Sequence, residues 1–375
     1  MTRNYISGKI CIIYGNDWGI DMLREVSKDY ITSAKPNASF SINTGSDSNY
    51  YQLKLPYQIT YEFCSGTEED DYMNAITFSE DESFYARDSF PGHDKAFHDH
   101  PLHFHDYYEI MIVLSGTVTQ RIEDVDYKYP AGTCCLINRG IRHAENFDTE
   151  SSILFVGLST SMIGELFTVA EHSSFHSEKD FMKSNLYKFI ISDLDNPDRK
   201  AYLDMIPAFA KTSGFEQVKE LSTEMLNTMM FPHFGSSYKM RSLLSELLYF
   251  ISSTDNYHCT EVEMGMGNDQ LLFSRVEHLM VERNGRVTRS ELEKALNYSG
   301  DYLNRIVNKF TGMCLYDYGM TFCLRKAAMD LVNTKESISS IAQNLQFSNR
   351  THFYSLFEKQ YHMTPKEYRA KHVSA

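Results

Sequence analysis

The most constraining feature of the sequence is a pattern that occurs twice between residues 288 and 369, at an offset of about fifty positions. The matched pairs include Leu292 and Ala342, Ala295 and Leu345, Leu303 and Phe353, Ile306 and Leu356, Val307 and Phe357, and Tyr318 and Tyr368. A fixed offset of this kind is typical of a duplicated structural unit. Each copy places apolar residues at helical spacing on two short segments with a tight break between them, which predicts two pairs of helices.

The starts of several helices and the polar face of the second helix are well marked in both units. Thr288 with Glu291, and Thr364 with Glu367, fit a capping box, in which each side chain accepts a bond from the other residue's backbone N–H. The polar faces carry Asp301, Tyr302, Asn304, Arg305, Asn308 and Lys309 in the first unit, and Asn349, Arg350, Thr351, Tyr354, Ser355 and Lys359 in the second. Such side chains can bond to base edges and phosphates in a major groove, so each unit is predicted to be a helix-turn-helix that binds double-stranded DNA.

A longer signature surrounds the second unit. The string ISSIAQNLQFSNRTHFYSLFEKQYHMTPKEYR, which spans residues 338–369, closely resembles the signature of the AraC/XylS family of bacterial transcription regulators. The resemblance covers roughly the last hundred residues and implies an all-α DNA-binding domain over 271–375 that contains both units. Gln346 departs from the family pattern, which usually has Gly before the Phe, and we expect the loss of Gly to strain this turn.

Positions in the family motif imply which side chains contact DNA. The implied contacts are Asp301, Asn304, Arg305 and Lys309 in the first unit, and Arg350, Thr351, Tyr354, Ser355 and Lys359 in the second. Arg305 and Arg350 are expected to read bases, because a guanidinium can bond to both O6 and N7 of guanine. Lys309 and Lys359 lie further along their helices and are expected to contact phosphates.

Charge is unevenly distributed along the chain. The formal net charge of −14 would by itself oppose binding to phosphate. Residues 271–375 nevertheless contain 15 Lys and Arg against 10 Asp and Glu, whereas residues 1–270 contain 21 against 40. Any small helical domain has polar outer faces, but the segregation of basic residues onto the repeat favours a DNA-binding function.

Upstream, residues 57–160 are predicted to form β-structure, because short segments rich in β-branched and aromatic residues are separated by Gly, Pro and Asp. Two stretches, HFHDYYEIMIVLSG and YPAGTCCLINRGIRHAENF, resemble the two motifs of the cupin β-barrel. The matching residues are His103, His105, Glu109 and Gly116 in the first motif and Gly132, Gly140 and His143 in the second. Asn138 replaces the usual Pro of the second motif, and Phe97 stands where the first motif begins with Gly. The resemblance implies a cupin-like sensor domain.

The spacing of the first motif predicts which side chains share a face. His103, His105 and Glu109 have the same parity, so an extended strand directs them to one side. By parity Tyr107 joins them and Tyr108 faces away, which makes Tyr107 the better candidate to contact a ligand. The predicted effector-binding residues are therefore His103, His105, Tyr107, Glu109 and His143. The resemblance also implies that His103, His105, Glu109 and His143 could hold a divalent metal, although no cofactor is required, since regulators of this type use the same residues to line an effector pocket.

The remaining segments carry no chemical motif. Residues 1–56 are treated as an N-terminal extension of uncertain structure. Residues 161–265 are predicted to be helical, and Met240, Leu243, Leu244, Leu247, Leu248 and Ile251 form one wide apolar face. That face packs either on the chain's own barrel or, as the family suggests, on a second copy in a homodimer. Residues 254–270, without periodicity, are predicted to be the linker between domains.

These observations predict an α+β multidomain protein that is not an enzyme. The seven cysteines form no CxxC spacing, no apolar run reaches the length of a membrane span, and no signal peptide is recognised, so a cytoplasmic location is expected. The predicted function is sequence-specific promoter binding in response to a small effector such as a sugar or related metabolite, with RNA polymerase as a further partner if the outcome is activation. Two alternatives stay open: a cupin metalloenzyme of the dioxygenase or isomerase type, and a constitutive DNA-binding regulator with an unused barrel.

Overall fold

The structure is a computed structural model of the full chain. It describes residues 40–43, 49–66, 70–80, 83–91, 102–147, 151–208, 213–264 and 268–373. Most of the predicted N-terminal extension, residues 1–39, lies outside the described residues, as does Phe97. Within the described part, no helix is both long enough and apolar enough to cross a lipid bilayer.

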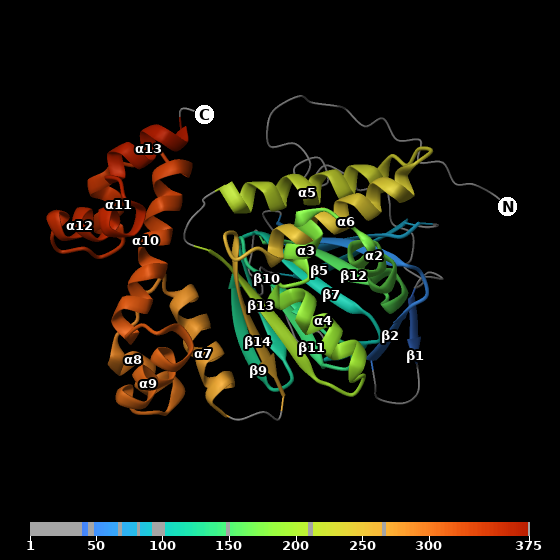
Figure 1. The fold of residues 1–375 in the computed structure, drawn as a ribbon, viewed down its shortest axis with the longest axis horizontal. Helices are drawn as coiled ribbons and strands as arrows, with labels where there is room; N and C mark the ends of the chain where they lie inside the picture. Colours follow the sequence, from blue (N-terminus) through green and yellow to red (C-terminus); the bar gives the residue numbers. More distant parts are fainter. Residues whose placement is uncertain are drawn as a thin grey trace.

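The described strands form two sheets in the N-terminal part of the molecule (Figure 1). The six-stranded sheet has the order β1 (Phe40–Asn43), β2 (Asn49–Leu53), β6 (His103–His105), β11 (His143–Phe147), β8 (Thr117–Ile122) and β9 (Val125–Pro130). The eight-stranded sheet has the order β14 (Tyr257–Glu263), β13 (Ala201–Pro207), β10 (Cys134–Ile137), β7 (Tyr108–Ser115), β12 (Ser152–Leu158), β3 (Tyr57–Gly66), β4 (Asp70–Phe78) and β5 (Ser83–Pro91). Neighbouring strands are antiparallel except β2 and β6, which run parallel.

Strand β7 shows how the larger sheet is buried on both faces. Tyr108, Ile110 and Ile112 belong to a core shared with helices, whereas Met111 and Val113 belong to a second core. That second core also contains Val118, Ile122, Tyr127 and Tyr129, which come from the smaller sheet, so it fills the barrel interior. Because successive side chains point to opposite faces, β7 reads as an almost continuous apolar run rather than as an alternation.

Helices cover the outer face of the larger sheet (Figure 1). They are α2 (Thr160–His172), α3 (His176–Phe181), α4 (Asn185–Asp195), α5 (Ser213–Met230) and α6 (Ser236–Ser252). The wide apolar face of α6 is buried against this sheet and the neighbouring helices, with Leu247 and Ile251 fully enclosed. The use of this face for a homodimer is therefore a wrong prediction, since the chain's own core already covers it.

The prediction of a helical region and linker over residues 161–265, with the linker at 254–270, is also wrong in part. Residues 201–207 and 257–263 are strands β13 and β14, which pair with each other and extend the larger sheet beyond β10. Asn138, at the position where the cupin motif has Pro, helps to hold β13: its amide donates to the Arg199 carbonyl at 2.7 Å and its oxygen accepts from Ala201 N–H at 3.1 Å. β14 is an edge strand whose residues alternate in burial. The acidic and Gly residues around it made this segment resemble a linker in the sequence.

The C-terminal part is all helical, as predicted. Its helices are α7 (Asn268–Glu282), α8 (Arg289–Leu296), α9 (Gly300–Thr311), α10 (Leu315–Asn333), α11 (Ile338–Asn344), α12 (Arg350–Tyr361) and α13 (Pro365–Val373). The duplicated sequence builds two separate small cores, and the long helix α10 contributes to both, with Phe322 in the first and Leu324 in the second. Both predicted capping boxes are present, at Thr288 with Glu291 and at Thr364 with Glu367.

Candidate functional site

Helices α8 and α9 form the first helix-turn-helix. Asn297 ends α8 in the left-handed region, with φ of 57°, and the Ser299 side chain then caps α9. Leu303, Ile306 and Val307 bury one face of α9 in the first core. The opposite face of α9 is consequently directed outward, which is the arrangement that a groove-reading helix requires.

Helices α11 and α12 form the second unit in the same way. The turn between them passes through Gln346, which adopts φ of 57°, and Asn349 caps α12 by accepting from Thr351 N–H at 2.8 Å. The expected strain is therefore present, because a non-Gly residue in the left-handed region costs roughly 1–2 kcal/mol. The bond from Phe347 N–H to the Ala342 carbonyl, at 2.9 Å, closes the turn.

The side chains on α9 that are predicted to contact DNA differ in their exposure and in their present partners within the protein. Arg305 is exposed, and its guanidinium lies over the Tyr302 ring at 4.7 Å from the ring centroid. Asp301 is exposed and forms an ion pair with Arg289 at 2.9 Å. Asn304 is half-buried, and its oxygen accepts from Leu315 N–H at 2.8 Å, so part of its bonding capacity already stabilises the turn before α10. Lys309 is exposed and pairs with Asp269 at 2.8 Å.

The predicted contacts on α12 are mostly exposed. Arg350, Thr351, Ser355 and Lys359 all reach solvent, whereas Tyr354 is half-buried. One Arg350 nitrogen donates to the Tyr354 hydroxyl at 3.0 Å, which holds the guanidinium along the helix surface. This bond ties Arg350, the first residue of α12, to a side chain one turn further along the helix.

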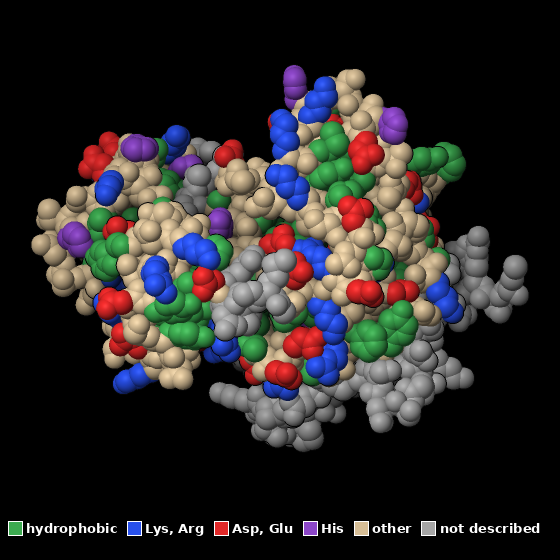
Figure 2. Space-filling model, turned by 60° about the horizontal axis from the view of Figure 1, so that its bottom comes forward, with side chains coloured by type: hydrophobic (Ala, Val, Ile, Leu, Met, Phe, Trp, Pro, Cys, Tyr) green, Lys and Arg blue, Asp and Glu red, His purple; other side chains and the backbone are tan. Residues whose placement is uncertain are grey.

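Sequence reasoning missed Arg289. It lies at the start of α8, and it contacts both Glu293 and Asp301 at the edge of the α9 surface. The available signal was its place one residue after the capping Thr288. Figure 2 shows basic and acidic side chains interspersed over the face that it draws, rather than one continuous basic patch.

A second polar cluster is buried inside the barrel. His103 lies opposite His143 on β6 and β11 of the smaller sheet, while Glu109 projects from β7 of the larger sheet. The His143 Nε2 atom lies 3.2 Å from Glu109 Oε1, and His105 Nε2 lies 3.7 Å from the same oxygen. The structure thus brings together the predicted residues His103, His105, Glu109 and His143. The prediction that one strand carries the first three is wrong, because a bend at Asp106 and Tyr107 separates β6 from β7 and the two strands belong to different sheets.

The histidines are oriented by backbone carbonyls. His105 Nδ1 donates to the Tyr107 carbonyl at 2.8 Å, and His143 Nδ1 donates to the Ile141 carbonyl at 3.1 Å. Each Nε2 atom is thereby directed at Glu109. Among the described residues, His105 Nε2 finds no hydrogen-bond partner although it is buried. Imidazoles held in this way resemble the arrangement of metal-binding histidines, which donate their second N–H to a carbonyl or carboxylate.

Burial and mutual contact shift the pKa values of the acidic and basic side chains in the cluster. Burial tends to raise the pKa of Glu109, but its contacts with the imidazoles of His105 and His143 outweigh burial and hold this pKa well below its usual value. Burial raises the pKa of Glu145 to about 7, with the Glu109 charge adding to the effect and His143 opposing it. Burial lowers the pKa of His105, whereas for His143 the two carboxylates outweigh burial and raise the pKa. The cluster therefore favours a cation near His143 and Glu109.

Two residues of this site were not predicted from the sequence. Glu145 lies two residues after His143 on β11, so its parity was an available signal, and its Oε1 accepts from Gln120 at 3.2 Å. Tyr51 lies on β2 beside His103, with ring centroids 5.3 Å apart. Candidate ligand atoms of His103, Glu109, His143 and Glu145 all lie within 4.8 Å of one another.

The parity prediction for the two tyrosines is consistent with the structure. The Tyr107 ring is buried and stacks on His105 with 4.0 Å between ring centroids. Tyr108 points to the other side of the sheet, where its hydroxyl donates to Asp193 of α4 at 2.6 Å. Tyr107 therefore belongs to the buried cluster and Tyr108 to the helical layer.

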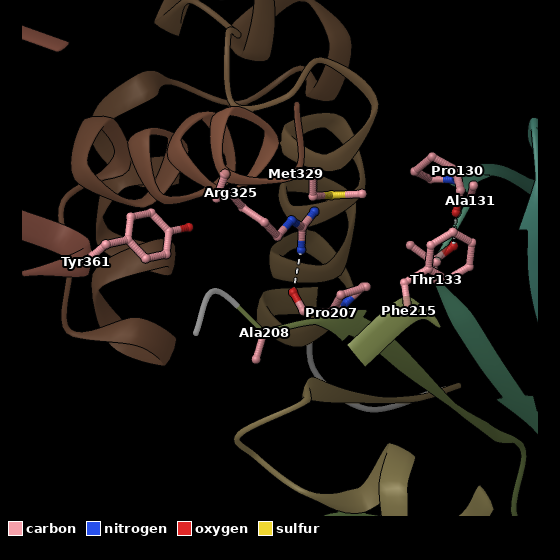
Figure 3. Close-up of a pocket in the computed structure, with 11 residues that line it drawn as sticks. Pro130, Ala131, Thr133, Pro207, Ala208, Phe215, Arg325, Met329 and Tyr361 are labelled. Carbon is pink, nitrogen blue, oxygen red and sulfur yellow. Dashed lines mark hydrogen bonds between the residues drawn. The ribbon is translucent and has the colours of Figure 1, made fainter. Parts of the chain in front are cut away.

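A small pocket separates the second helix-turn-helix from the barrel (Figure 3). Its walls come from both parts of the molecule, with Pro130 and Phe215 on the barrel side and Met329 and Tyr361 on the helical side. Arg325 crosses it and donates to the Pro207 carbonyl at 2.6 Å (Figure 3). Its volume of about 40 Å³ leaves room for only a few water molecules.

Two family profiles match separate parts of the chain. A profile described as a helix-turn-helix domain matches residues 292–371, and one described as an AraC-like ligand-binding domain matches residues 92–167. The first match spans both helix-turn-helix units, and the second spans the strands that carry the buried cluster.

Curated relatives are similar to the chain at low identity. The chain is 23% identical over 274 residues to the HTH-type transcriptional activator RhaS of Enterobacter sp. (strain 638), covering 72% of this chain and 87% of that protein. It is 25% identical over 162 residues to an uncharacterized HTH-type transcriptional regulator of Staphylococcus aureus, covering 42% of this chain and 21% of that protein. Among solved structures, ToxT from Vibrio cholerae bound to an unsaturated fatty acid is 11% identical, with a TM-score of 0.27, over 85% of this chain and 96% of ToxT.

Proposed function

The chain is a DNA-binding transcription regulator of the AraC family, and on that premise we propose that a small polar effector binds inside its barrel and changes how promoter DNA is held. One observation carries this proposal: charged and aromatic side chains converge inside the barrel, at a place where an apolar core would be expected. Burying such groups costs free energy unless they are paired or bind a ligand. The proposed effector-binding residues are His103, His105, Tyr107, Glu109 and His143.

The chemistry of the cluster supports a ligand that carries hydroxyl groups. Carboxylate oxygens of Glu109 and Glu145 accept hydrogen bonds, while Tyr51 and the imidazoles offer donors. Alternating donors and acceptors suit sugars and related metabolites, which present several hydroxyls on a small frame. The apolar residues that surround the cluster, such as Met111, would exclude water and strengthen these bonds.

A divalent cation also fits the residues that are present. Two imidazoles and two carboxylates within 4.8 Å form a donor set suited to Zn²⁺, Mn²⁺ or Fe²⁺. His103, Glu109, His143 and Glu145 would hold the ion, and His105 lies next to this set through its contact with Glu109. A bound cation would neutralise the two buried carboxylates and could present an open position to an effector hydroxyl.

We further propose that α9 and α12 enter successive major grooves, which lie about 34 Å apart along the duplex. Arg305 and Arg350 would read bases, with Asp301, Asn304, Thr351, Tyr354 and Ser355 beside them, and Lys309 and Lys359 would contact phosphates. Lys309 would have to exchange its present partner, Asp269, for a phosphate. Binding of DNA would then be sensitive to residues that hold α7 next to α9.

The test uses effector-dependent DNA binding. Purified wild-type protein and Glu109→Gln are screened against small polar metabolites by thermal shift, and operator affinity is measured with and without each hit. A stabilising metabolite that changes the operator affinity of wild type, but not of Glu109→Gln, supports the proposal. The matched control is Asp126→Asn, an acid-to-amide change on the exposed face of the same barrel, which should leave the response intact.

The same samples separate the two rival functions. A cupin metalloenzyme would bind metal and convert the metabolite, so product formation monitored by mass spectrometry would favour it. A constitutive regulator would bind the operator with the same affinity under every condition. Both outcomes would contradict a sensory barrel.

A further inference from the structure

Helix α7 is shared between the two parts of the molecule. It packs against α8, α9 and α10 of the DNA-binding domain, and it also packs on β9 and β14 at the edges of the two sheets. Figure 1 shows it standing between the barrel and helices α8 and α9. Any change in how α7 lies on the barrel must therefore be passed to the first helix-turn-helix.

A buried carboxylate of the barrel is directed at this helix. Asp204 on β13 is 1% exposed. It accepts hydrogen bonds from the Tyr129 hydroxyl at 2.6 Å, from His278 Nε2 at 2.9 Å and from the Ser274 hydroxyl at 3.3 Å. Tyr129 belongs to the barrel, whereas His278 and Ser274 belong to α7. One buried charge thus joins the two domains.

His278 is placed to carry the opposite charge. Its Nε2 donates to Asp204, and its Nδ1 faces the Lys128 carbonyl at 3.5 Å, so both ring nitrogens face acceptors. An imidazole can satisfy two acceptors only when it is doubly protonated. The ring is enclosed by Tyr127 and Tyr129, with centroids 4.6 Å and 4.8 Å away. Burial opposes the charge, but Asp204 and then Glu277 outweigh it and raise the pKa of His278.

The neighbouring Glu277 makes a second connection. It is buried, and its two oxygens accept from Thr260 of β14 at 2.7 Å and from Tyr318 of α10 at 2.5 Å. His258 of β14 lies 3.7 Å away and is half exposed. This carboxylate therefore bridges the barrel edge and the DNA-binding domain beside the His278–Asp204 pair.

The register of the larger sheet places Asp204 on the same face as the buried cluster. Met111, two residues after Glu109 on β7, is paired with Cys135, and Cys135 is paired with Asp204. Paired residues in a ladder project to one face, and so do residues two apart on a strand. Asp204 thus faces the barrel interior that also contains Glu109.

We infer that the ion pair between His278 of α7 and Asp204 of β13 is an interdomain latch that fixes the DNA-binding domain, and with it α9, against the barrel. The latch extends beyond the proposed function, because it operates whether or not the barrel binds an effector. The second helix-turn-helix faces the barrel across the pocket of Figure 3, where Arg325 of α10 donates to the Pro207 carbonyl. Opening the latch would free the position of α9 without unfolding either domain.

The experiment measures the distance between the domains in the full-length protein. Spin labels are attached at Ser245→Cys on α6 and Asn308→Cys on α9, both exposed positions, in a background with Cys11→Ser and Cys314→Ser. Ser is expected to replace Cys314 as the cap of α10. The expected wild-type result is one narrow distance distribution. In His278→Gln and in Asp204→Asn, more than about half of the molecules should show distances outside this narrow distribution. The reason is that breaking a buried ion pair strongly destabilises the interface that contains it.

Three controls make the result decisive. A label pair that does not involve the DNA-binding domain, at Ser245→Cys on α6 and Asp124→Cys on the barrel, should keep its distance in every variant and thus report an intact fold. Lys128→Ala removes only the exposed pair with Glu282 at the same interface and should leave the interdomain distribution unchanged. The double variant His278→Gln/Asp204→Asn should be no broader than either single variant. An unchanged distribution in both single variants, or a double variant that is additively broader, would overturn the latch.

Discussion

The Nε2 atom of His143 lies 3.2 Å from Oε1 of Glu109, and this contact joins the two sheets inside the barrel. Since Nδ1 of His143 donates to the Ile141 carbonyl, the Nε2 atom meets the carboxylate either as a second N–H or through a cation between them. A buried carboxylate next to an imidazole nitrogen can bind a cation or a ligand that carries hydrogen-bond donors.

The first prediction concerns metal. Purified protein should bind about one equivalent of a divalent ion, and His143→Ala should release it, because the imidazole and two carboxylates would share the ion. Occupancy is measured by elemental analysis after dialysis, with Asp126→Asn as the variant that should keep the metal. Stoichiometric metal that persists in a His103→Ala/His143→Ala variant would contradict the ligand set.

The second prediction concerns base reading. Arg305→Ala and Arg350→Ala should each weaken operator binding by on the order of 1–3 kcal/mol and relax specificity at one or two base pairs, because a bidentate contact to guanine is lost. Binding to a library of single-base operator variants measures both effects. A uniform loss across all variants would show that these residues contact phosphates only.

Lys309 and Lys359 provide the matched comparison. Their replacement by Ala should weaken all operator variants alike and reduce the dependence of affinity on salt, with a slope smaller by roughly one per lost contact. If either change alters the sequence preference instead, its assignment to phosphate is wrong.

The third prediction concerns stability. Gln346→Gly should raise the free energy of unfolding by about 1 kcal/mol, because Gly adopts φ of 57° without the clash that Gln suffers. Gln343→Gly, in the neighbouring helix α11, is the control and should lower it by roughly 0.5–1 kcal/mol. Urea unfolding measures the free energy of unfolding of both variants. Equal effects of the two changes would show that the turn is not strained.

The fourth prediction concerns pH. The pKa of His278 is raised in the folded protein, chiefly by Asp204 against the opposing effect of burial. The latch should therefore be fully formed below the unfolded pKa of about 6.5 and be lost as pH rises through the higher folded value. The acidic side chains that act on His278 are those of Asp204 and Glu277, and the rings of Tyr127 and Tyr129 enclose it. The label distance between α6 and α9 should broaden from pH 6 to pH 9 in wild type.

His278→Gln serves as the control for this titration, since it has no group to titrate in that range. Its distance distribution should be broad and independent of pH. If the wild-type distance distribution stays narrow at pH 9, either the folded pKa of His278 lies above the tested range or the latch carries no charge. If the distribution of His278→Gln depends on pH, a group other than His278 is responsible for the effect.

The DNA-binding domain could be predicted from the sequence almost completely, because its signals are local. The repeat, the capping Thr288 and Thr364, and the apolar faces all act within a few residues of one another. Even the strained turn was foreseeable from Gln346. The contacts that hold Asn304 to Leu315 and Lys309 to Asp269 were not foreseeable, since they join residues brought together only by packing.

The barrel was predictable in its motif but not in its extent. The motif of His103, His105 and Glu109 indicated a shared interior, although the sequence did not show that these residues lie on two strands of different sheets. Tyr51 comes from a strand with no recognisable pattern. Strands β13 and β14 come from a segment dominated by helices, and their partners lie far away in the sequence. The apolar face of α6 showed only that something must cover it. Which surface covers it depends on tertiary packing, and in the structure it is the larger sheet of the same chain.

The central claim is that a ligand inside the barrel controls DNA binding. The most direct measurement is the change in operator affinity that the effector causes, in wild type and in the single variants His103→Ala, Glu109→Gln and His143→Ala. Each variant should bind the operator like wild type without effector, while its response to the effector is lost or reduced at least about 10-fold. An equal response in wild type and all three variants would contradict the account and place the effector elsewhere.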